Sequence, residues 1–371
     1  MKIGVPKEIK NHEYRVGMTP SSVREAVSHG HSVMIETRAG EGIGAADNEY
    51  QAVGATIIDR AEDIFSSAEM IVKVKEPQAV ERAMLRKDQI LFTYLHLAPD
   101  PDQTKDLISS GATCIAYETV TSPYGGLPLL APMSKVAGRM AIQAGAHCLE
   151  HPHGGRGILL GGVPGVDRAK VVVLGAGVVG KHAAAIAAGM GAEVWVVDRS
   201  PEVIEAHWQQ FGTSTNTVFS TRDAVEKHVL DADLVIGGVL IPGASAPKLV
   251  THEMVAAMKP GSVIVDVAID QGGCCETSKA TTHADPTYRV DDVVHYCVAN
   301  MPGGVPRTST YALNNVTLPH ILTLANQGFR KALKSDSHLC NGLNVHDGQV
   351  TNAEVAADLG YNYVDPMSVL G

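Results

Sequence analysis

The sequence has little of what would take a chain into a membrane or onto nucleic acid. Its longest apolar runs, at 171–180 and 183–192, fall short of the ~18 residues that a membrane-spanning helix needs. Positive charge is also in deficit, with 30 Lys and Arg against 40 Asp and Glu and a net charge of −10. No basic surface is needed to account for these residues, so we expect neither nucleic acid nor a membrane as a partner.

Cysteine is scarce as well, and the chain begins without an apolar leader. Its first segment, MKIGVPKEIKN, is charged from the second residue and lacks the apolar core, roughly 7–15 residues long, of a secretory signal. None of the six cysteines forms a C-x-x-C pair, and a chain of 371 residues can build its core without disulfides. We therefore expect a cytoplasmic protein with free thiols.

Histidine is frequent, with 16 residues, and the segment HCLEHPH at 147–153 invites a metal site. His147 and His151 would share one face of a helix, and His153 follows. A third well-placed ligand is not evident, and the Pro and Gly residues nearby mark the end of a helix, where histidine complements the helix dipole. We therefore expect no metal.

Two series of short β-branched runs, each interleaved with helical stretches, follow one another along the chain. The first series predicts strands at 3–5, 31–36, 55–59, 69–74, 89–95 and 113–119. The second predicts strands at 171–174, 193–197, 217–220, 233–237, 262–269 and 295–299. Strands that alternate with helices predict right-handed crossovers and a parallel sheet in each series.

A Gly/Pro-rich stretch at 122–132 and a long predicted helix at 134–150 separate the two series. A helical tail follows the second series, and Pro319 either kinks one of its helices or divides two. A last helix is expected where Thr351 and Glu354 have capping-box spacing. The tail is too short for a domain of its own, so we expect it to pack back on the first series.

These patterns predict an α/β protein of two domains. Residues 129–306 should form a doubly wound, Rossmann-type dinucleotide-binding domain. This domain would be inserted into a discontinuous α/β catalytic domain with a parallel sheet, which is built from residues 1–128 and completed by a helical return at 307–371.

The second series opens with the most specific motif of the chain. Gly175, Gly177 and Gly180 have G-x-G-x-x-G spacing, follow a predicted strand and open a predicted helix. They allow a tight turn, close approach to a pyrophosphate and close helix packing, while amide groups and the helix dipole bind the anion. The next strand ends in Asp198, which should hydrogen-bond the adenosine ribose and repel a 2′-phosphate, so NAD is expected rather than NADP.

Polar residues also follow the predicted strands, where ligands of open α/β sheets bind. Lys75, His96 and Asp270 each end an apolar run, and Arg15 lies in the loop after the first strand. Each has an ordinary alternative interpretation: the two cations as solvated loop residues, the histidine as a core-edge residue and the aspartate as a turn former.

The joint placement of these four residues suits hydride transfer at a carbon next to a carboxylate. Arg15 and Lys75 would hold the substrate carboxylate. His96 would exchange a proton with the substrate, and Asp270 would orient a water or steady an iminium. The nicotinamide would carry the redox step.

The chain resembles the bacterial L-alanine dehydrogenases nearly end to end, in the motifs KEIKNHEYRVGMTP, KVKEP, TYLHLAP, APMSKVAGRMA, VVVLGAGVVG, VLIPGA, DVAIDQGG and VANMPGGVPRTST. The resemblance implies reversible NAD-dependent oxidative deamination of L-alanine to pyruvate and ammonium. It also implies two-domain subunits in a homo-oligomer, commonly a hexamer. Arg15 and Lys75 would then bind the substrate, with His96 and Asp270 as the catalytic pair.

The resemblance further implies a set of cofactor-binding residues around the NAD. They are Ser134, Gly175, Gly177, Val178, Val179, Gly180, Asp198, Ser220, Val239, Leu240, Ile269, Lys279, Asn300 and Met301. Lys279 stands where the family's arginine is expected, and Val203 stands where some members carry lysine. Both departures touch only the adenosine end, so they bear on cofactor affinity rather than on the reaction.

Other classes remain open. The soluble NAD(H)-binding component of the proton-translocating transhydrogenase shares this architecture and the opening motif. Its corresponding helix follows a loop that contains Arg-Gln, whereas this chain reads APMS at 131–134, which favours the dehydrogenase. A 2-hydroxy-acid dehydrogenase would need no ammonium, and a non-catalytic NAD-sensing module would turn over no substrate.

Overall fold

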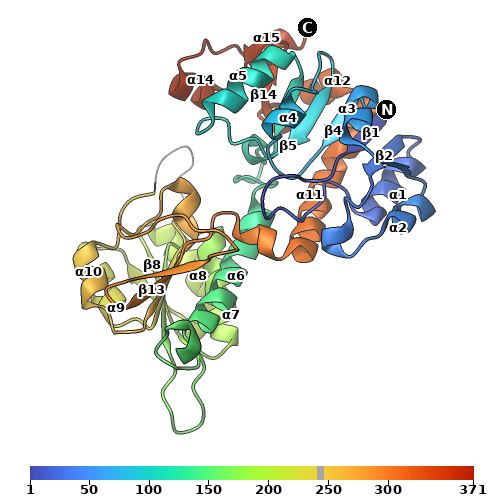
Figure 1. The fold of residues 1–371 in the computed structure, drawn as a ribbon. Coiled ribbons are helices and arrows are strands. Elements are labelled where there is room, and N and C mark those ends of the chain that lie inside the picture. The colour runs from blue at the N-terminus through green and yellow to red at the C-terminus, as the bar shows by residue number, and fades with distance from the viewer. Residues whose placement is uncertain (240–245) are drawn as a thin grey trace. The chain divides into compact units, whose positions relative to one another are not determined.

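The computed structural model describes residues 1–239 and 246–371, and the chain divides into two compact units (Figure 1). The first unit comprises residues 1–133 and 303–371, and the second comprises residues 134–302. The first unit is therefore built from both ends of the chain, with the second unit between them in the sequence.

In the first unit the described residues form an eight-stranded sheet in the order β15-β14-β6-β5-β4-β1-β2-β3. Neighbouring strands run parallel except where β14 pairs with β6 and with β15. The elements are β1 (Lys2–Val5), α1 (Pro20–Ser28), β2 (Ser32–Glu36), η1 (Glu41–Ile43), α2 (Asp47–Ala52), β3 (Thr56–Ile58), α3 (Ala61–Ser67), β4 (Met70–Val72), α4 (Ala79–Arg82), β5 (Ile90–Thr93), α5 (Pro101–Ser110), β6 (Thr113–Ala116), η2 (Tyr117–Thr119), α11 (Pro306–Gln327), α12 (Phe329–Ser335), α13 (Ser337–Cys340), β14 (Leu343–His346), β15 (Gln349–Val350), α14 (Ala353–Leu359) and α15 (Pro366–Val369).

In the second unit the described residues form a seven-stranded sheet in the order β12-β13-β11-β10-β7-β8-β9, parallel except for the β12–β13 pair. The elements are α6 (Ala131–Cys148), which begins at the boundary of the units, η3 (His151–His153), β7 (Lys170–Leu174), α7 (Val178–Gly189), β8 (Glu193–Asp198), α8 (Pro201–Phe211), η4 (Gly212–Ser214), β9 (Asn216–Phe219), α9 (Arg222–Leu230), β10 (Leu234–Gly237), α10 (His252–Ala257), β11 (Val263–Asp266), η5 (Val267–Gln271), β12 (Thr287–Val290), β13 (Val293–Tyr296) and η6 (Met301–Gly304).

This architecture confirms the predicted fold class of two α/β domains with parallel-dominated sheets. The expected domain limits, at 128/129 and 306/307, fall a few residues from the observed ones. Among the described residues, no helix combines the length and apolar character of a membrane span.

The structure corrects details of the C-terminal stretch and of the second sheet. The stretch is not purely helical, because β14 and β15 add two antiparallel strands, and β12 adds one to the second sheet. Helix α11 continues through Pro319 undivided. The side chain that caps α14 is Asn352, which accepts from the Val355 amide at 3.0 Å, whereas the Thr351 hydroxyl donates to the Leu343 carbonyl at 2.9 Å. The expected capping box is therefore wrong, because Thr351 is engaged by a neighbouring strand.

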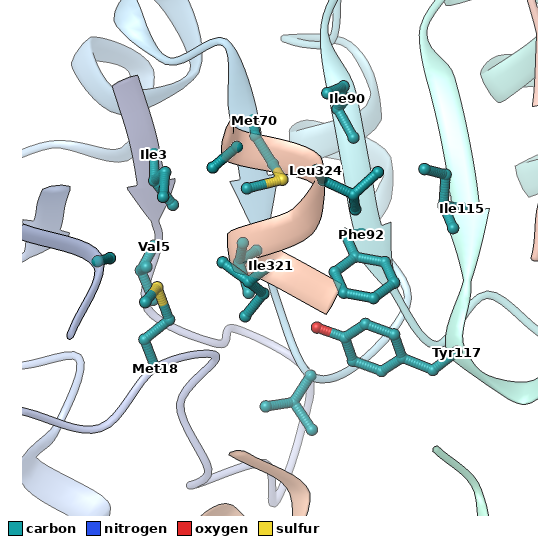
Figure 2. Close-up of a cluster of buried hydrophobic side chains, with 14 of the residues drawn as sticks. Ile3, Val5, Met18, Met70, Ile90, Phe92, Ile115, Tyr117, Ile321 and Leu324 are labelled. Carbon is teal, nitrogen blue, oxygen red and sulfur yellow. The ribbon is translucent and has the colours of Figure 1, made fainter. Parts of the chain in front are cut away.

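Helix α11 shows why the C-terminal stretch joins the N-terminal one. Ile321 and Leu324, on one face of the helix, belong to the same core cluster as Ile3, Met70 and Phe92 from three strands (Figure 2). All five side chains are fully buried. Burial of apolar surface from both stretches therefore closes the first unit.

In the second unit, successive side chains of β7 point to opposite faces of the sheet and pack in two different core clusters. Val171 and Val173 of β7 pack in a cluster with Ala183 of α7, while Val172 and Leu174 belong to the cluster that includes α9 and α10. A strand covered on both faces needs apolar residues at every position, which explains the continuous run VVVL.

Each sheet has one point where the strand order reverses. In the first unit β1 is followed outward by β2 and β3, and the chain then returns to place β4 on the other side of β1. In the second unit β10 returns in the same way beside β7. Ligands of open α/β sheets bind outside the carboxyl ends of the strands at such points, so the loops after β1, β4, β7 and β10 are where a site is expected.

Replacement of Ile321 by alanine should lower the free energy of unfolding by about 2–5 kcal/mol, because it leaves a cavity between α11 and the first sheet. Asn315→Ala, at an exposed position of the same helix, is the matched control and should stay within about 0.5 kcal/mol of the parent. Denaturant unfolding measures both. Equal stability of the two variants would contradict the packing described.

Candidate functional site

Arg15, in the loop after β1, is a buried cation with a fixed direction. Its Nε donates to Glu13 Oε1 at 2.7 Å and its Nη2 to Oε2 at 2.5 Å, while Nη1 faces the sulfur of Met133 at 3.0 Å. Burial works to lower the pKa of Arg15, but Glu13 outweighs burial and the pKa is raised. The guanidinium therefore stays charged where it lies, 2% exposed.

Lys75, in the loop after β4, is held through its backbone. Glu8 Oε1 accepts from the amides of Val74, at 2.6 Å, and of Lys75, at 3.4 Å. The Lys75 ammonium lies 3.9 Å from Glu76. Burial raises the pKa of Glu76, but Lys75 and Lys10 outweigh it, and the pKa of Glu76 is lowered.

A second lysine, which the sequence interpretation missed, pairs with the same Glu8 that holds the Lys75 backbone. The Lys73 ammonium is fully buried between Glu8, at 3.0 Å, and Glu81, at 2.7 Å. Burial raises the pKa of Glu8, with Glu13 and Glu81 adding to the rise and Lys73 opposing it. The sequence signal that could have revealed Lys73 is a cation directly after the fully buried run of β4, where burial requires a charged partner.

His96 follows β5 in a backbone conformation that L-residues rarely adopt, with φ of +49°. Glu118 holds it there, because Oε1 accepts from the His96 amide at 2.6 Å and from the Leu95 amide at 3.1 Å. The same oxygen lies 4.0 Å from His96 Nδ1, and the imidazole stacks on Tyr94 with ring centroids 5.8 Å apart. Such strain persists at functional sites when the surroundings fix it, and here a carboxylate and an aromatic ring do so.

The structure brings Arg15, Lys75 and His96 to one edge of the first sheet. They follow β1, β4 and β5, which are neighbours in the strand order and run parallel. The side chain of His96 is 41% exposed, so it remains open to solvent or a ligand. Two fixed cations and an accessible imidazole at one sheet edge suit recognition of a small carboxylate.

In the second unit, the loop after β7 has the geometry of a dinucleotide-binding turn. Gly175 has φ of +95°, and a Cβ on Gly180 would lie 1.8 Å from the Gly175 carbonyl oxygen. Gly177 caps helix α7 without a side chain, and a Cβ there would meet nothing within 4 Å. The helix N-terminus therefore offers its amides to an anion, which is the property that a pyrophosphate needs.

Asp198, at the end of β8, ties the neighbouring loops together. Its Oδ2 accepts from the Ala176 amide at 2.7 Å and its Oδ1 from the Ser200 amide at 2.9 Å. Its carbonyl accepts from the amide of Ser220 at 2.8 Å. The carboxylate of Asp198, which is predicted to hydrogen-bond the ribose, thus lies beside the glycine loop, as the fingerprint requires.

The other predicted cofactor residues differ in exposure. Val178 is exposed; Ser134, Ser220, Val239 and Asn300 are partly buried; and Val179, Ile269 and Met301 are buried. Asn300 has φ of +62°. Lys279 is exposed, with its ammonium over the Tyr288 ring at 4.4 Å from the centroid. Leu240 lies outside the described residues.

Asp270, in η5 after β11, is exposed, and the buried Asp266 fixes the turn that carries it. Asp266 Oδ1 accepts from the Ala268 amide at 3.1 Å, while Oδ2 accepts from the Cys274 amide at 2.8 Å and the Ser278 hydroxyl at 2.6 Å. These hydrogen bonds fix residues that precede Asp270 in the sequence and residues that follow it. Asp266 was also missed, although a carboxylate inside the apolar run SVIVDVAI signals a structural role.

Together these features define a class: a doubly wound α/β protein with a dinucleotide loop in one unit and a pair of fixed cations beside a histidine in the other. The model of the alanine dehydrogenase/PNT N-terminal domain matches residues 4–137, and that of the C-terminal domain matches residues 141–353. The chain belongs to the alanine dehydrogenase family.

Individual relatives agree. The alanine dehydrogenase of Halomonas elongata is 60% identical over 371 residues, which is all of both chains. A solved L-alanine dehydrogenase is 53% identical and covers 97% of this chain, as 99% of its own, with a TM-score of 0.94. A transhydrogenase from Sinorhizobium meliloti is 26% identical, covers 94% of this chain and all of its own, and has a TM-score of 0.83. The family and the glycine loop together imply a nicotinamide nucleotide as cofactor.

Gly180→Ala should weaken NADH binding at least about tenfold, or ~1.4 kcal/mol, because its Cβ cannot fit beside the Gly175 carbonyl. Gly189→Ala is the matched control in the same helix. Its Cβ meets nothing within 4 Å, so affinity should persist and stability should rise by up to about 1 kcal/mol. Fluorescence titration with NADH compares the two, and parental affinity in Gly180→Ala would remove this loop from the cofactor site.

Proposed function

We propose that this protein is an NAD-dependent alanine dehydrogenase, which interconverts L-alanine with pyruvate and ammonium. The observation that carries the proposal is the buried Arg15, fixed by Glu13 at the sheet edge where Lys75 and His96 also lie. The end-to-end similarity to curated alanine dehydrogenases supports the choice of substrate.

In this proposal the substrate carboxylate binds to the first unit. Arg15 offers a planar guanidinium whose direction Glu13 already sets, so little entropy is lost on binding. Lys75 adds a second positive charge from the neighbouring strand end. The two cations bind the carboxylate of the three-carbon acid and so orient it. Its amine-bearing carbon then remains accessible to the nicotinamide, His96 and Asp270.

A bound nicotinamide would supply the acceptor for the hydride that leaves the alanine Cα. Loss of this hydride would turn the neutral substrate amine into an iminium, and a water would add to the iminium carbon to give a carbinolamine. His96 Nδ1 or Nε2 takes the proton that this water loses and returns it to the amine as the carbinolamine splits into pyruvate and ammonium. Asp270 orients the water and stabilises the positive iminium.

The choice of NAD over NADP rests on Asp198. Its carboxylate lies beside the glycine loop, where its negative charge would repel the 2′-phosphate of NADP. We propose further that the chain works in the cytoplasm, on the sequence grounds given above, and that it assembles as a homo-oligomer of six subunits, which the resemblance supports. Light scattering after gel filtration measures the assembly.

The purified protein, with no partner added, should oxidise NADH when pyruvate and ammonium are both present, and should use NADPH poorly. Absorbance at the NADH band follows the reaction. Oxidation with pyruvate alone would instead indicate a 2-hydroxy-acid dehydrogenase. A requirement for a second nucleotide would indicate a transhydrogenase component, and inactivity with every small oxo acid would leave only an NAD-binding module.

His96→Ala and His96→Asn should each lose about 10²–10⁴-fold in turnover, the range typical of general acid–base catalysis. Asn is the sharper variant, because it tolerates positive φ and forms hydrogen bonds but cannot exchange the proton. NADH binding should be unchanged in both, which separates loss of chemistry from loss of fold. Near-normal turnover in His96→Asn would remove the imidazole from the mechanism.

A further inference from the structure

Three potential metal ligands of the second unit converge where α6 ends. His147 Nδ1 lies 3.6 Å from Glu150 Oε1, and His153 Nε2 lies 3.6 Å from Glu150 Oε2. One ligand atom from each of the three side chains lies within 4.8 Å of the others. The side chains are 60%, 53% and 42% exposed in chain order, so an ion from solvent can reach them.

The backbone sets this convergence. Helix α6 ends at Cys148 and the chain tightens into successive three-residue turns, in which the Glu150 amide donates to the His147 carbonyl at 3.2 Å and the His153 amide donates to the Glu150 carbonyl at 3.0 Å. Glu150 itself is extended, with ψ of 140°, so the chain bends between the two turns. The bend brings His147 to one carboxylate oxygen of Glu150 and His153 to the other, and Glu150 becomes the third ligand that the helical spacing of His147 and His151 did not supply.

Glycine keeps the turn in place. The amide of Gly155 donates to the Glu150 carbonyl at 3.2 Å, and a Cβ on Gly155 would lie 2.2 Å from the Cys148 carbonyl oxygen. The backbone that carries the ligands is therefore fixed before any ion binds, which reduces the entropy that binding must overcome.

We propose that His147, Glu150 and His153 form a surface site for a divalent transition-metal ion such as Zn²⁺. Two imidazoles and a carboxylate are an established zinc donor set, and ligand bonds of about 2.0–2.1 Å need donors closer than the 3.6 Å observed on each side of Glu150 and the 4.8 Å within which all three donors lie. The side chains are exposed, so they can rotate toward an ion. The C-terminus of an 18-residue helix also carries partial negative charge, which favours a cation.

The other cluster of potential ligands among the described residues is unsuitable. Asp266, Cys274 and Cys275 are buried together, but the carboxylate already accepts the hydrogen bonds that fix the Asp270 turn. A hydrogen bond with Cys275 and burial both raise the pKa of the Cys274 thiol, which opposes the thiolate that a metal requires.

The surface site lies away from the residues assigned to the dinucleotide. Arg156 donates from its amide to the Gly261 carbonyl at 3.0 Å, just before β11, and a Cβ on Gly154 would lie 3.6 Å from Val294 near the start of β13. The cluster therefore lies at the amino ends of the parallel strands, whereas the glycine loop lies at their carboxyl ends.

Titration calorimetry of the full chain, without an affinity tag, with ZnCl₂ tests the site. The parent should bind one Zn²⁺ per chain at this site, and His147→Ala and His153→Ala should each weaken that binding at least about tenfold, since even outer-shell losses cost 10–100-fold. Glu150→Gln should weaken it as well. Circular dichroism and NADH binding should remain unchanged, because all three side chains are exposed.

His151→Ala is the matched control, since His151 is exposed in the same turn but lies outside the cluster. It should bind Zn²⁺ as the parent does. Equal affinities in His147→Ala, His151→Ala and the parent would overturn the proposal, as would absence of stoichiometric binding by the parent.

Discussion

The buried ion pair between Arg15 and Glu13 is the interaction on which the first unit's site depends. A guanidinium taken out of water needs a partner in direct contact, because an unpaired buried charge costs several kcal/mol. Glu13 therefore fixes not only the charge state of Arg15 but also the direction in which it points. Lys73 and Glu8 apply the same constraint one strand away, where their pairing holds the backbone of Lys75.

Carboxylates that accept backbone amides recur in both units as the device that shapes loops. Glu118 holds the strained His96, Asp198 holds the glycine loop through Ala176, and Asp266 holds the turn around Asp270. A charged acceptor bonds an amide more strongly than a neutral one does. Irregular backbone at the carboxyl ends of the strands can therefore be rigid without regular secondary structure.

Local pattern was enough to predict most of the parallel strands and the glycine loop, because their signals lie within a few residues of sequence. The antiparallel β12, β14 and β15 were missed, since they depend on pairing between distant segments. Lys75 and His96 were predicted because each ends an apolar run, and Arg15 because it lies in the loop after the first strand. Glu118 was not, because its role depends on a contact 22 residues away with the amide of His96.

Helix α6 spans the distance between the predicted dinucleotide site, near its first turn, and the proposed metal site, which begins in its last turn. Ser134 near its start and His147 near its end are roughly 20 Å apart at about 1.5 Å per residue. At physiological salt, screening acts within about 8 Å, so the charge of an ion at His147 has little direct effect on a dinucleotide. Coupling between the two sites would therefore be mechanical, carried by a displacement of α6 or of the strands against which its Ala141 and Ile142 pack.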